Sequence, residues 1–277
     1  MIRADLHIHT YYSDGMQSPE SVILAAKGRG VDLVAITDHD NAAGCAEGAA
    51  LAKKAGVRFV DGVEVSAYSG DTKVHMLCYS MDYSSPEYTA FAAKLFSGAE
   101  ERTFDILKKL SSVGVNLEYG EVIRERKSKK SPVHGMYIAR AGARKGYASS
   151  PVDFFAKYLN YGKVGFSCIC RPTPQETAEV CVRSGGFCSL AHPGRISADE
   201  EWVKGLITGL KSHGLGGIEA VYSGHTDRQT QYYKGLAQSL SLLVTGGSDT
   251  HYQEGNRRIG DPCFYPSEEL LCALKIK

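Results

Sequence analysis

The sequence predicts an α/β fold in which parallel strands form a barrel surrounded by helices. Short apolar runs alternate with helical patterns along most of the chain, as this class requires. Metal-ligating side chains lie in or directly after these runs, and a length of 277 residues suits one such barrel. Barrels of parallel strands build their active sites at the C-terminal ends of different strands. The pattern therefore predicts a single site formed by several strand ends.

Six apolar runs are the candidate strands. In the first, Ala4 to Ile8, His7 shares one face with His9, because side chains two apart in a strand point the same way. The other five runs are Val31 to Ile36, Arg58 to Val65, Lys73 to Tyr79, Gly186 to Ala191 and Ser241 to Thr245. Each run carries or precedes a histidine or a carboxylate, so we expect the six strands to converge on one chemistry.

Helix signals lie in the connections between these strands. Ser18-Pro19-Glu20 combines a capping serine with proline at the first helical position, and opens a helix that runs to about Gly28. The alanine-rich segment Asn41 to Ala55 ends at Gly56, a C-terminal stop signal. Thr173-Pro174-Gln175-Glu176 has the pattern of a capping box and starts another helix.

The stretch after Tyr79 departs from the strand and helix rhythm. Ser85-Pro86 opens a long helical pattern that closes near Gly114. Further helices are predicted at Glu121 to Lys127, Tyr137 to Lys145 and Pro151 to Tyr158. The sequence therefore predicts a barrel of residues 1–84 and 172–277, with residues 85–171 inserted as a small helical, basic domain that caps the substrate.

Imidazole and carboxylate groups recur at the predicted strand ends. The main candidates are His7, His9, Asp38, His39, Asp40, Glu64, His75, His192, Asp249 and His251. A carboxylate can hold two cations about 3.5–4 Å apart, and Glu64 suits this bridging role. Mixed nitrogen and oxygen ligands suit zinc, iron or manganese better than magnesium or calcium. The pattern predicts a multinuclear metallohydrolase.

The motifs resemble those of the polymerase and histidinol phosphatase (PHP) family of phosphoesterases. The matching segments follow the family order along nearly the whole chain: His7-Ile8-His9, Ser13-Asp14-Gly15, Thr37-Asp38-His39-Asp40, Gly62-Val63-Glu64-Val65-Ser66, Ala191-His192-Pro193-Gly194 and Gly247-Ser248-Asp249-Thr250-His251. The resemblance implies a distorted seven-stranded (β/α) barrel, similar to a TIM barrel, that holds two or three divalent metals and hydrolyses phosphate esters.

The resemblance also implies which residues bind each metal. The first site would use His7, His9, Glu64 and Asp249; the second, bridging Glu64 with His75 and His192; the third, Asp14, His39 and His251. Glu64, Asp249 and His251 are the catalytic candidates. The expected reaction is in-line attack of a metal-bound hydroxide on a phosphomonoester. A water on the third metal or His225 would protonate the leaving group.

Four residues are candidates for substrate contact. Arg140 lies in a segment that resembles His-Ile-Ala-Arg of relatives, although Tyr137 replaces the histidine and His134 could compensate. Arg offers two parallel donors to a phosphate. Arg171 and His225 resemble positions that face the phosphate in relatives. Each of Arg140, Arg171 and His225 could equally be an ordinary surface residue.

Charge is unevenly distributed and bears on the substrate. Residues 100–171 contain 14 Lys and Arg against 7 Asp and Glu, a net charge of +7, whereas the rest of the chain has a net charge of −6. A basic insert facing a metal site favours a substrate with several negative charges. Nucleoside 5′-monophosphates or 3′,5′-bisphosphates are the expected substrates; a short oligonucleotide is also conceivable. The nearly neutral total charge argues against tight binding of duplex DNA.

Other functions are left open. A cyclic phosphate phosphodiesterase, a 5′-3′ oligoribonuclease and a histidinol phosphatase all fit the resemblance. Amidohydrolases also begin with His-x-His, but a modified lysine commonly bridges their metals, whereas Glu64 has that place here. A non-catalytic metal-binding module is a further alternative.

The remaining composition indicates a cytoplasmic protein. No apolar stretch approaches the roughly 20 residues of a membrane helix, and the first strand begins almost at Met1, which leaves no room for a signal peptide. No C-x-x-C pair occurs, so the eight cysteines are expected to be reduced and structural.

Overall fold

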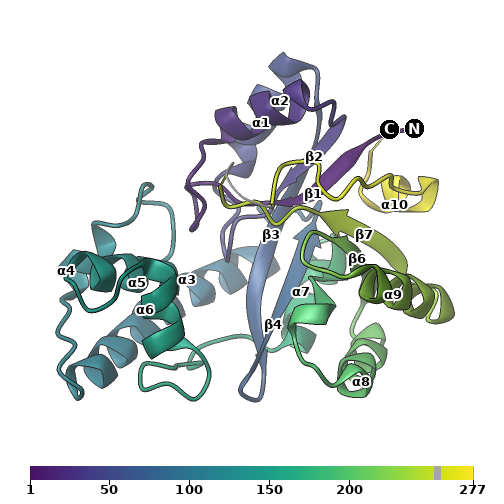
Figure 1. Cartoon of the computed structure of the whole chain (residues 1–277). Coiled ribbons are helices and arrows are strands. Elements are labelled where there is room, and N and C mark those ends of the chain that lie inside the picture. Colours follow the sequence, from purple (N-terminus) through teal and green to yellow (C-terminus); the bar gives the residue numbers. More distant parts are fainter. Residues whose placement is uncertain (253–256, 277) are drawn as a thin grey trace.

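The computed structural model describes residues 1–252 and 257–276. Within these residues, seven strands form one sheet in the order β1-β2-β3-β4-β5-β6-β7, so strands that follow each other in the chain are neighbours in the sheet. Their bounds are β1 Ala4–Ile8, β2 Leu33–Ile36, β3 Arg58–Ser69, β4 Thr72–Tyr79, β5 Phe187–Leu190, β6 Leu215–Tyr222 and β7 Leu243–Gly247. Helices surround the sheet (Figure 1), and Ile2 and Ile276, near the two ends of the described chain, pack against the same hydrophobic cluster. The fold is the expected seven-stranded α/β barrel.

One strand runs against the others, which corrects the expectation of an all-parallel barrel. Strand β4 is antiparallel to both β3 and β5, while the remaining neighbours are parallel. Only two residues, Gly70 and Asp71, connect β3 to β4, and so short a link can join only antiparallel strands. His75 therefore lies in the first half of β4, not at its end, and pairs with Ser66 of β3. The reversal still brings His75 to the end of the barrel where the other candidates lie.

The first and last strands meet through the segment that follows β7. The N–H of Asp249 donates to the carbonyl of His7 at 2.8 Å, and the N–H of His9 donates to the carbonyl of Thr250 at 3.0 Å. Close approach requires glycine at position 247, since a Cβ there would lie 2.4 Å from that of His7. The contacts that close the barrel thus also fix three candidate ligands relative to one another.

The helices outside the barrel include those that the capping signals predict. They are α1 Pro19–Gly28, α2 Cys45–Ala55, α7 Pro174–Arg183, α8 Glu200–Lys211, α9 Asp227–Ser239 and α10 Glu268–Ala273. Ser18 accepts a hydrogen bond from the N–H of Ser21 at 3.1 Å, and Thr173 accepts one from Glu176 at 3.1 Å. The sequence analysis did not locate β6, α8 and α9, because glycines and a glutamate interrupt β6 and because α9 is largely polar.

A second group of helices follows β4 and precedes β5 in the sequence, and it projects to one side of the barrel (Figure 1). It contains α3 Pro86–Ser111, α4 Tyr119–Ile123, α5 Gly135–Arg144, α6 Pro151–Phe154 and the π-helical turn η1 Phe155–Leu159. The first half of α3 packs Phe91 and Leu95 into a barrel core, whereas its second half packs Ile106 and Leu110 into a separate cluster with α5. One long helix therefore joins two hydrophobic cores.

The cysteines form no disulfide among the described residues. Four of them, Cys45, Cys78, Cys181 and Cys188, are buried in the packed interior. None of the helices in the part of the chain that the structure describes has both the length and the apolar character needed to cross a membrane.

Candidate metal centre

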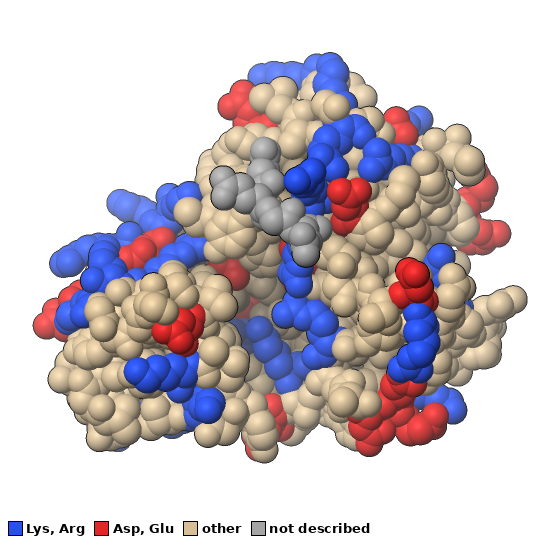
Figure 2. Space-filling view, in the orientation of Figure 1, with Lys and Arg blue, Asp and Glu red and all other residues tan. Residues whose placement is uncertain are grey.

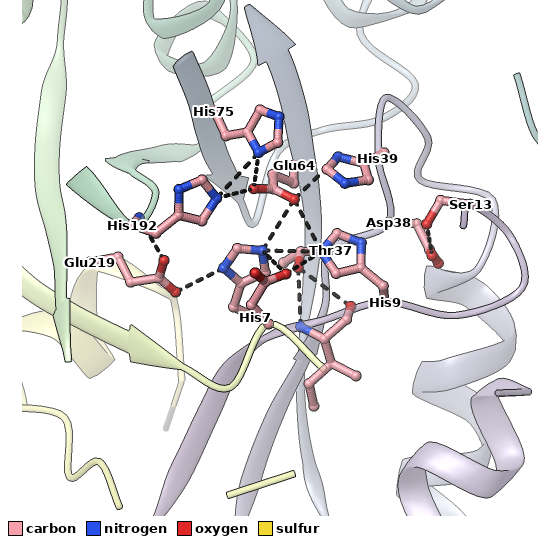
Figure 3. Close-up of polar contacts among 12 residues, drawn as sticks. His7, His9, Ser13, Thr37, Asp38, His39, Glu64, His75, His192 and Glu219 are labelled. Carbon is pink, nitrogen blue, oxygen red and sulfur yellow. Dashed lines mark hydrogen bonds and ion pairs between the residues drawn. The ribbon is translucent and has the colours of Figure 1, made fainter. Parts of the chain in front are cut away.

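Glu64, on β3, lies at the centre of a cluster of imidazoles (Figure 3). Its side chain is buried, and Oε2 lies 3.2 Å from Nε2 of His7 and 3.0 Å from Nε2 of His9. Nδ1 of His39 is 3.2 Å from the same oxygen. Three imidazoles from two neighbouring strand ends thus face one carboxylate oxygen.

The second oxygen of Glu64 faces a different pair of imidazoles. Oε1 lies 2.7 Å from Nδ1 of His75 and 3.0 Å from Nε2 of His192. His75 belongs to β4, and His192 follows β5. Because its two oxygens face separate groups of nitrogen atoms, this carboxylate has the arrangement that a bridge between two cations requires.

A third group lies beside the first. Oδ1 of Asp14 is 3.2 Å from Nε2 of His251 and 3.9 Å from Nε2 of His39. Asp249 closes the first group, with Oδ1 3.3 Å from Nε2 of His9. The structure thus brings together all nine residues that the sequence proposes as ligands. The ligand atoms converge within 4.8 Å in three sets: His7, His9, Glu64 and Asp249; His39, Glu64 and His75; and His9, Asp14, His39 and His251.

The polar atoms of this cluster fit divalent metals better than they fit one another. Nε2 of His7 and Nε2 of His9 are only 3.1 Å apart and point at the same carboxylate. Several buried atoms of the cluster make no hydrogen bond among the described residues, including Glu64 Oε2, Asp14 Oδ1 and His39 Nδ1. Buried polar atoms are rarely left in this state, since each one costs free energy. Imidazole nitrogens and carboxylate oxygens are the donors that zinc, iron and manganese accept.

Backbone conformation at the strand ends helps to aim these side chains. Asp40, His192 and Asp249 have φ angles of 54°, 28° and 53°, in the left-handed region that residues other than glycine seldom adopt. Each directly follows or lies within a predicted ligand motif. Such backbone is maintained only where the surrounding structure compensates for it, and it is concentrated at functional sites.

Glu219 contacts two of the candidate ligands from outside the cluster. This buried residue of β6 contacts Nδ1 of His7 through Oε1 at 2.8 Å and accepts the backbone N–H of His192 through Oε2 at 2.8 Å. A carboxylate on Nδ1 leaves the lone pair of Nε2 directed at the site, which is how outer carboxylates orient metal-binding histidines. The sequence analysis missed Glu219, although a lone glutamate in an apolar strand is a usable signal.

Asp38 holds a loop and does not face the cluster. Its carboxylate accepts hydrogen bonds from the N–H of Thr10 at 2.7 Å, from the hydroxyl of Thr10 at 2.6 Å and from the hydroxyl of Ser13 at 2.6 Å. These bonds fix the loop after β1, which carries Asp14. Asp38 therefore contributes to the site by positioning the loop that carries Asp14.

Charge balance keeps the central carboxylate ionised. Burial alone would raise the pKa of Glu64, but His75, His7 and His39 hold that pKa well below its usual range. Burial likewise opposes the charged form of His7, yet the carboxylates of Glu219, Glu64 and Asp249 raise its pKa. The carboxylates and imidazoles of the centre therefore stabilise each other's charged forms, so the carboxylates stay ionised and available to a cation.

Seven of the nine candidate ligands, all except His7 and His9, line a cavity of about 790 Å³. Lys73, Arg195 and Arg257 supply positive charge to its wall, while apolar side chains of the helical segment, Met136, Val152 and Phe155, supply another part of the lining. Figure 2 shows basic side chains in the hollow between these helices and the barrel. The sequence analysis missed all three basic residues, although Arg195 directly follows the Ala191-His192-Pro193-Gly194 motif.

Of the four residues predicted to contact substrate, only His134 lines this cavity, and its ring stacks on that of His39 at 4.7 Å. Arg140 donates to the backbone carbonyl of Asp14 at 2.7 Å. The guanidinium of Arg171 forms an ion pair with Asp40.

His225 is also held away from the cavity lining. Its Nε2 accepts the N–H of Gly194 at 3.1 Å, and its Nδ1 faces the carbonyl of Ala220 at 3.1 Å. Both ring nitrogens are therefore occupied, and burial lowers the pKa of this imidazole. This arrangement argues against His225 as the proton donor for a leaving group.

Comparison with known proteins agrees with this geometry. The family model of the PHP domain matches residues 5–145. The chain is 31% identical to a 5′-3′ exoribonuclease of Haemophilus influenzae, with 92% of each protein covered. It is 30% identical to a 3′,5′-nucleoside bisphosphate phosphatase of Chromobacterium violaceum, covering 94% of this chain and 91% of the relative. A phosphoribosyl 1,2-cyclic phosphate 1,2-diphosphodiesterase of Eggerthella lenta is also 30% identical, over 91% of this chain and 95% of that protein.

Two solved structures share the whole fold. One, from Bifidobacterium adolescentis, is described as a metal-dependent phosphoesterase; it has a TM-score of 0.85 and 26% identity, with 98% of this chain and 96% of that chain covered. The other, from Chromobacterium violaceum, is described as an amidohydrolase with bound sulfate and no metal. It has a TM-score of 0.85 and 29% identity, with 98% of this chain and 95% of that chain covered. The motif order, the barrel and these relatives lead to one assignment: the chain belongs to the PHP domain family and is a metal-dependent phosphoesterase.

Proposed function

We propose that this phosphoesterase hydrolyses phosphomonoesters of nucleotides, with nucleoside 5′-monophosphates and 3′,5′-bisphosphates as its substrate class. The cavity combines cationic side chains for phosphate with apolar side chains for a base or a sugar. Relatives named for a nucleoside bisphosphate, for RNA and for a phosphoribosyl cyclic phosphate support a substrate that contains a phosphorylated ribose.

Two or three divalent ions, of manganese, zinc or iron, would be held at this centre. His7, His9, Glu64 and Asp249 would hold the first, Glu64 with His75 and His192 the second, and Asp14, His39 and His251 the third. When bound, the metals would lower the pKa of water and neutralise charge on the phosphate oxygens. The converging lone pairs around Glu64 support this assignment.

The protein's own groups would bind and orient the ester. Arg195 and Arg257 contact Oδ2 of Asp249 at 3.4 and 2.7 Å, so their guanidinium groups lie at the edge of the candidate metal centre. Lys73 adds a third positive charge to the cavity lining. These three would attract and hold the phosphate, while His134 would contact the substrate beside the third metal site. Arg140 and Arg171 would act by positioning, since each already binds a loop that carries candidate ligands.

Residues 1–84 and 172–277 would form the catalytic barrel, with residues 85–171 as an inserted domain that caps the substrate. The separate hydrophobic cluster of α3 and α5 supports this division. The insert also binds the loop of Asp14 by two hydrogen bonds. The hydroxyl of Tyr137 donates to the carbonyl of Ser13, and the guanidinium of Arg140 donates to the carbonyl of Asp14. Tyr137, where relatives have histidine, therefore contacts this loop.

The observation that carries the proposal is the position of Glu64, with each oxygen facing its own group of imidazoles at the base of a basic cavity. To test it, protein reconstituted with manganese is assayed for phosphate release from adenosine monophosphate and adenosine 3′,5′-bisphosphate. Asp249→Asn serves as the control for contaminating phosphatases. Release by the wild type but not by the variant would support the proposal; equal release by both would contradict it.

Further substrates, assayed with the same reconstituted protein, separate the alternatives. Preference for a cyclic nucleotide, a short RNA or histidinol phosphate would assign the corresponding activity instead. Exclusive cleavage of amides or lactones would make the protein an amidohydrolase, as one solved relative is described. Stoichiometric metal without turnover on any of these substrates would indicate a binding module.

A further inference from the structure

Three buried cysteines meet at one point between the sheet and a helix that covers it. They are Cys78 of β4, Cys181 of α7 and Cys188 of β5, and their Sγ atoms all lie within 4.8 Å of one another. Cys78 and Cys188 are direct partners in the antiparallel pairing of β4 with β5. None of the three residues is more than 1% exposed. Three different elements thus bring three sulfur atoms together in the interior, and we call this group the cysteine cluster.

The cysteine cluster lies on the opposite side of β4 from the candidate metal centre. His75 and Cys78 are three residues apart in this strand, so their side chains point to opposite faces of the sheet. His75 faces Glu64, whereas Cys78 belongs to the hydrophobic core that packs α7 against the sheet (Figure 1). The cluster is therefore separate from the residues that would carry out phosphate ester hydrolysis.

The spacing of the sulfur atoms suits a bound metal ion. A bond between a metal and a thiolate is about 2.3 Å long, so three thiolates in a plane around one ion place their sulfur atoms about 4 Å apart. Buried cysteines often act only as small hydrophobic side chains, but hydrophobic packing does not require three Sγ atoms to meet. The convergence of the three thiols therefore indicates a binding site.

The number of donors bears on which ion fits. Thiolates are soft ligands, which select Cu(I), zinc or iron–sulfur clusters. Zinc in structural sites is held by four ligands, whereas no fourth Cys, His, Asp or Glu joins the group among the described residues. Cu(I) accepts three thiolates without a fourth ligand. The dry, three-sulfur arrangement therefore favours Cu(I) over zinc.

The surroundings of the cluster favour the thiolate form that binds metals. Burial opposes the thiolate of Cys181, but hydrogen bonds from the two neighbouring thiols and the charge of Lys275 lower its pKa to about 5. Nζ of Lys275 is held in place by the carbonyls of Ser80 and Gly185, each at 2.8 Å. A fixed positive charge thus offsets part of the negative charge that thiolates would bring into the interior.

Glycine at position 186 leaves space beside the cluster. A Cβ there would lie 2.9 Å from Sγ of Cys181 and 2.5 Å from Cγ of Met81. Ser184, Gly185 and Gly186 form the whole link between α7 and β5. Because two of these three residues have no side chain, local opening of this link would give an ion access to the thiols.

We propose that Cys78, Cys181 and Cys188 form a binding site for one Cu(I) ion, held by three thiolates. Each thiol that binds releases its proton to solvent, and the copper stays monovalent, so no electron is transferred. The ion would tie α7 to β4 and β5 and would stabilise the folded state, because the unfolded chain does not hold the three thiols together. This inference is independent of the substrate class proposed above.

The first test titrates Cu(I) anaerobically into the manganese-loaded protein, in competition with the chelator bicinchoninate. We expect the wild type to bind one equivalent, with a sulfur-to-copper charge-transfer absorption in the ultraviolet. Cys181→Ala and Cys188→Ala should each lower the affinity by more than about a hundredfold, since even the outer partners of metal ligands are worth about 10- to 100-fold. Cys45→Ala is the matched control, because Cys45 is also buried, at 4% exposure, but lies outside the cluster. Cys170→Ser controls for exposed thiols.

X-ray absorption at the copper edge decides the question on the wild type alone, whether or not the variants fold. Three sulfur neighbours would support the site, whereas a shell of nitrogen and oxygen atoms would place the copper among the imidazoles and overturn it. Equal affinity of the wild type and Cys181→Ala for Cu(I) would also overturn it, and tighter binding of zinc with a fourth ligand would overturn the assignment to copper. We expect copper to raise the melting temperature of the wild type but not of Cys181→Ala. Phosphate release from nucleotides should be the same in both proteins, so failure of the copper site and failure of the proposed function are distinguishable.

Discussion

Nδ1 of His7 lies 2.8 Å from Oε1 of Glu219, and both side chains are fully buried. The other oxygen of Glu219 accepts the backbone N–H of His192. A single carboxylate on β6 therefore orients two candidate metal ligands that come from opposite regions of the sequence. An outer partner of this kind sets the direction and the basicity of the imidazole that it contacts.

Glu219→Gln should weaken metal binding by about 10- to 100-fold, because glutamine keeps the size of the side chain but removes the charge that orients His7. Manganese titration by calorimetry measures the effect, and thermal unfolding of the metal-free protein shows whether the fold is retained. Glu179→Gln is the control, since Glu179 also contacts a histidine, His213, at 2.7 Å but on the exposed surface. Unchanged affinity in Glu219→Gln would rule out the orienting role.

Glu64→Gln should have a larger effect than Glu219→Gln. The substitution removes the negative charge that Glu64 places between the two groups of imidazoles, so at least one metal should be lost from the protein. We expect phosphate release to fall by more than about a hundredfold. Metal content by mass spectrometry and turnover are measured together, with the exposed Glu201→Gln as the control. Full metal content in Glu64→Gln would contradict a bridging role.

Local signals made most strands and capped helices predictable. The bounds of β1 and α1 agree with the apolar run and with the Ser18-Pro19 cap, because short-range sequence patterns determine both. The all-parallel arrangement was wrong, because the direction of β4 depends on a two-residue turn at Gly70 and Asp71 that the strand pattern itself does not reveal. Helix α9 was missed because its surface is polar over most of its length.

The candidate ligands could be predicted from motifs, whereas residues that act through tertiary contacts could not. Arg195 and Arg257 reach Asp249 from separate segments of the chain, and no spacing in the sequence links them. For Arg140 the sequence motif predicted a contact with phosphate. The structure instead places its guanidinium against the backbone carbonyl of Asp14. A motif identifies a conserved type of position, but the partner of a long side chain depends on the loops around it.

Arg140→Met separates the two roles of this arginine. If Arg140 positions the loop of Asp14, the variant should lose affinity for the metal held by Asp14, His39 and His251, and added metal should partly restore turnover. If Arg140 contacts the substrate, KM should rise while metal content stays the same. Arg144→Met, on the same helix, is the matched control, because the Arg144 side chain is largely exposed and pairs with Glu125. Metal titrations and steady-state kinetics distinguish these outcomes.

Removal of metal should destabilise the protein by several degrees in thermal unfolding. A ligand that binds only the folded state contributes about 2.7 kcal/mol at a concentration one hundred times its dissociation constant, and a chelator removes this contribution. The effect should be much smaller in Glu64→Gln, which lacks the bridging carboxylate. Scanning calorimetry with and without chelator, followed by addition of manganese, measures the shift. An unchanged melting temperature in the wild type would contradict tight metal binding.

Gly247→Ala should damage the barrel and the metal centre together. A Cβ at this position would lie 2.4 Å from Cβ of His7 and 2.6 Å from its backbone nitrogen, so β7 and β1 would have to move apart. Overpacking of this kind costs about 1–3 kcal/mol, and the displacement of His7 should also lower metal affinity. The control is Gly205→Ala in α8, where a Cβ meets nothing within 4 Å and alanine should stabilise the helix by up to about 1 kcal/mol. Urea unfolding and manganese titration measure the two effects. A stable Gly247→Ala variant with normal metal affinity would show that the closing contact between β1 and β7 does not position the ligands.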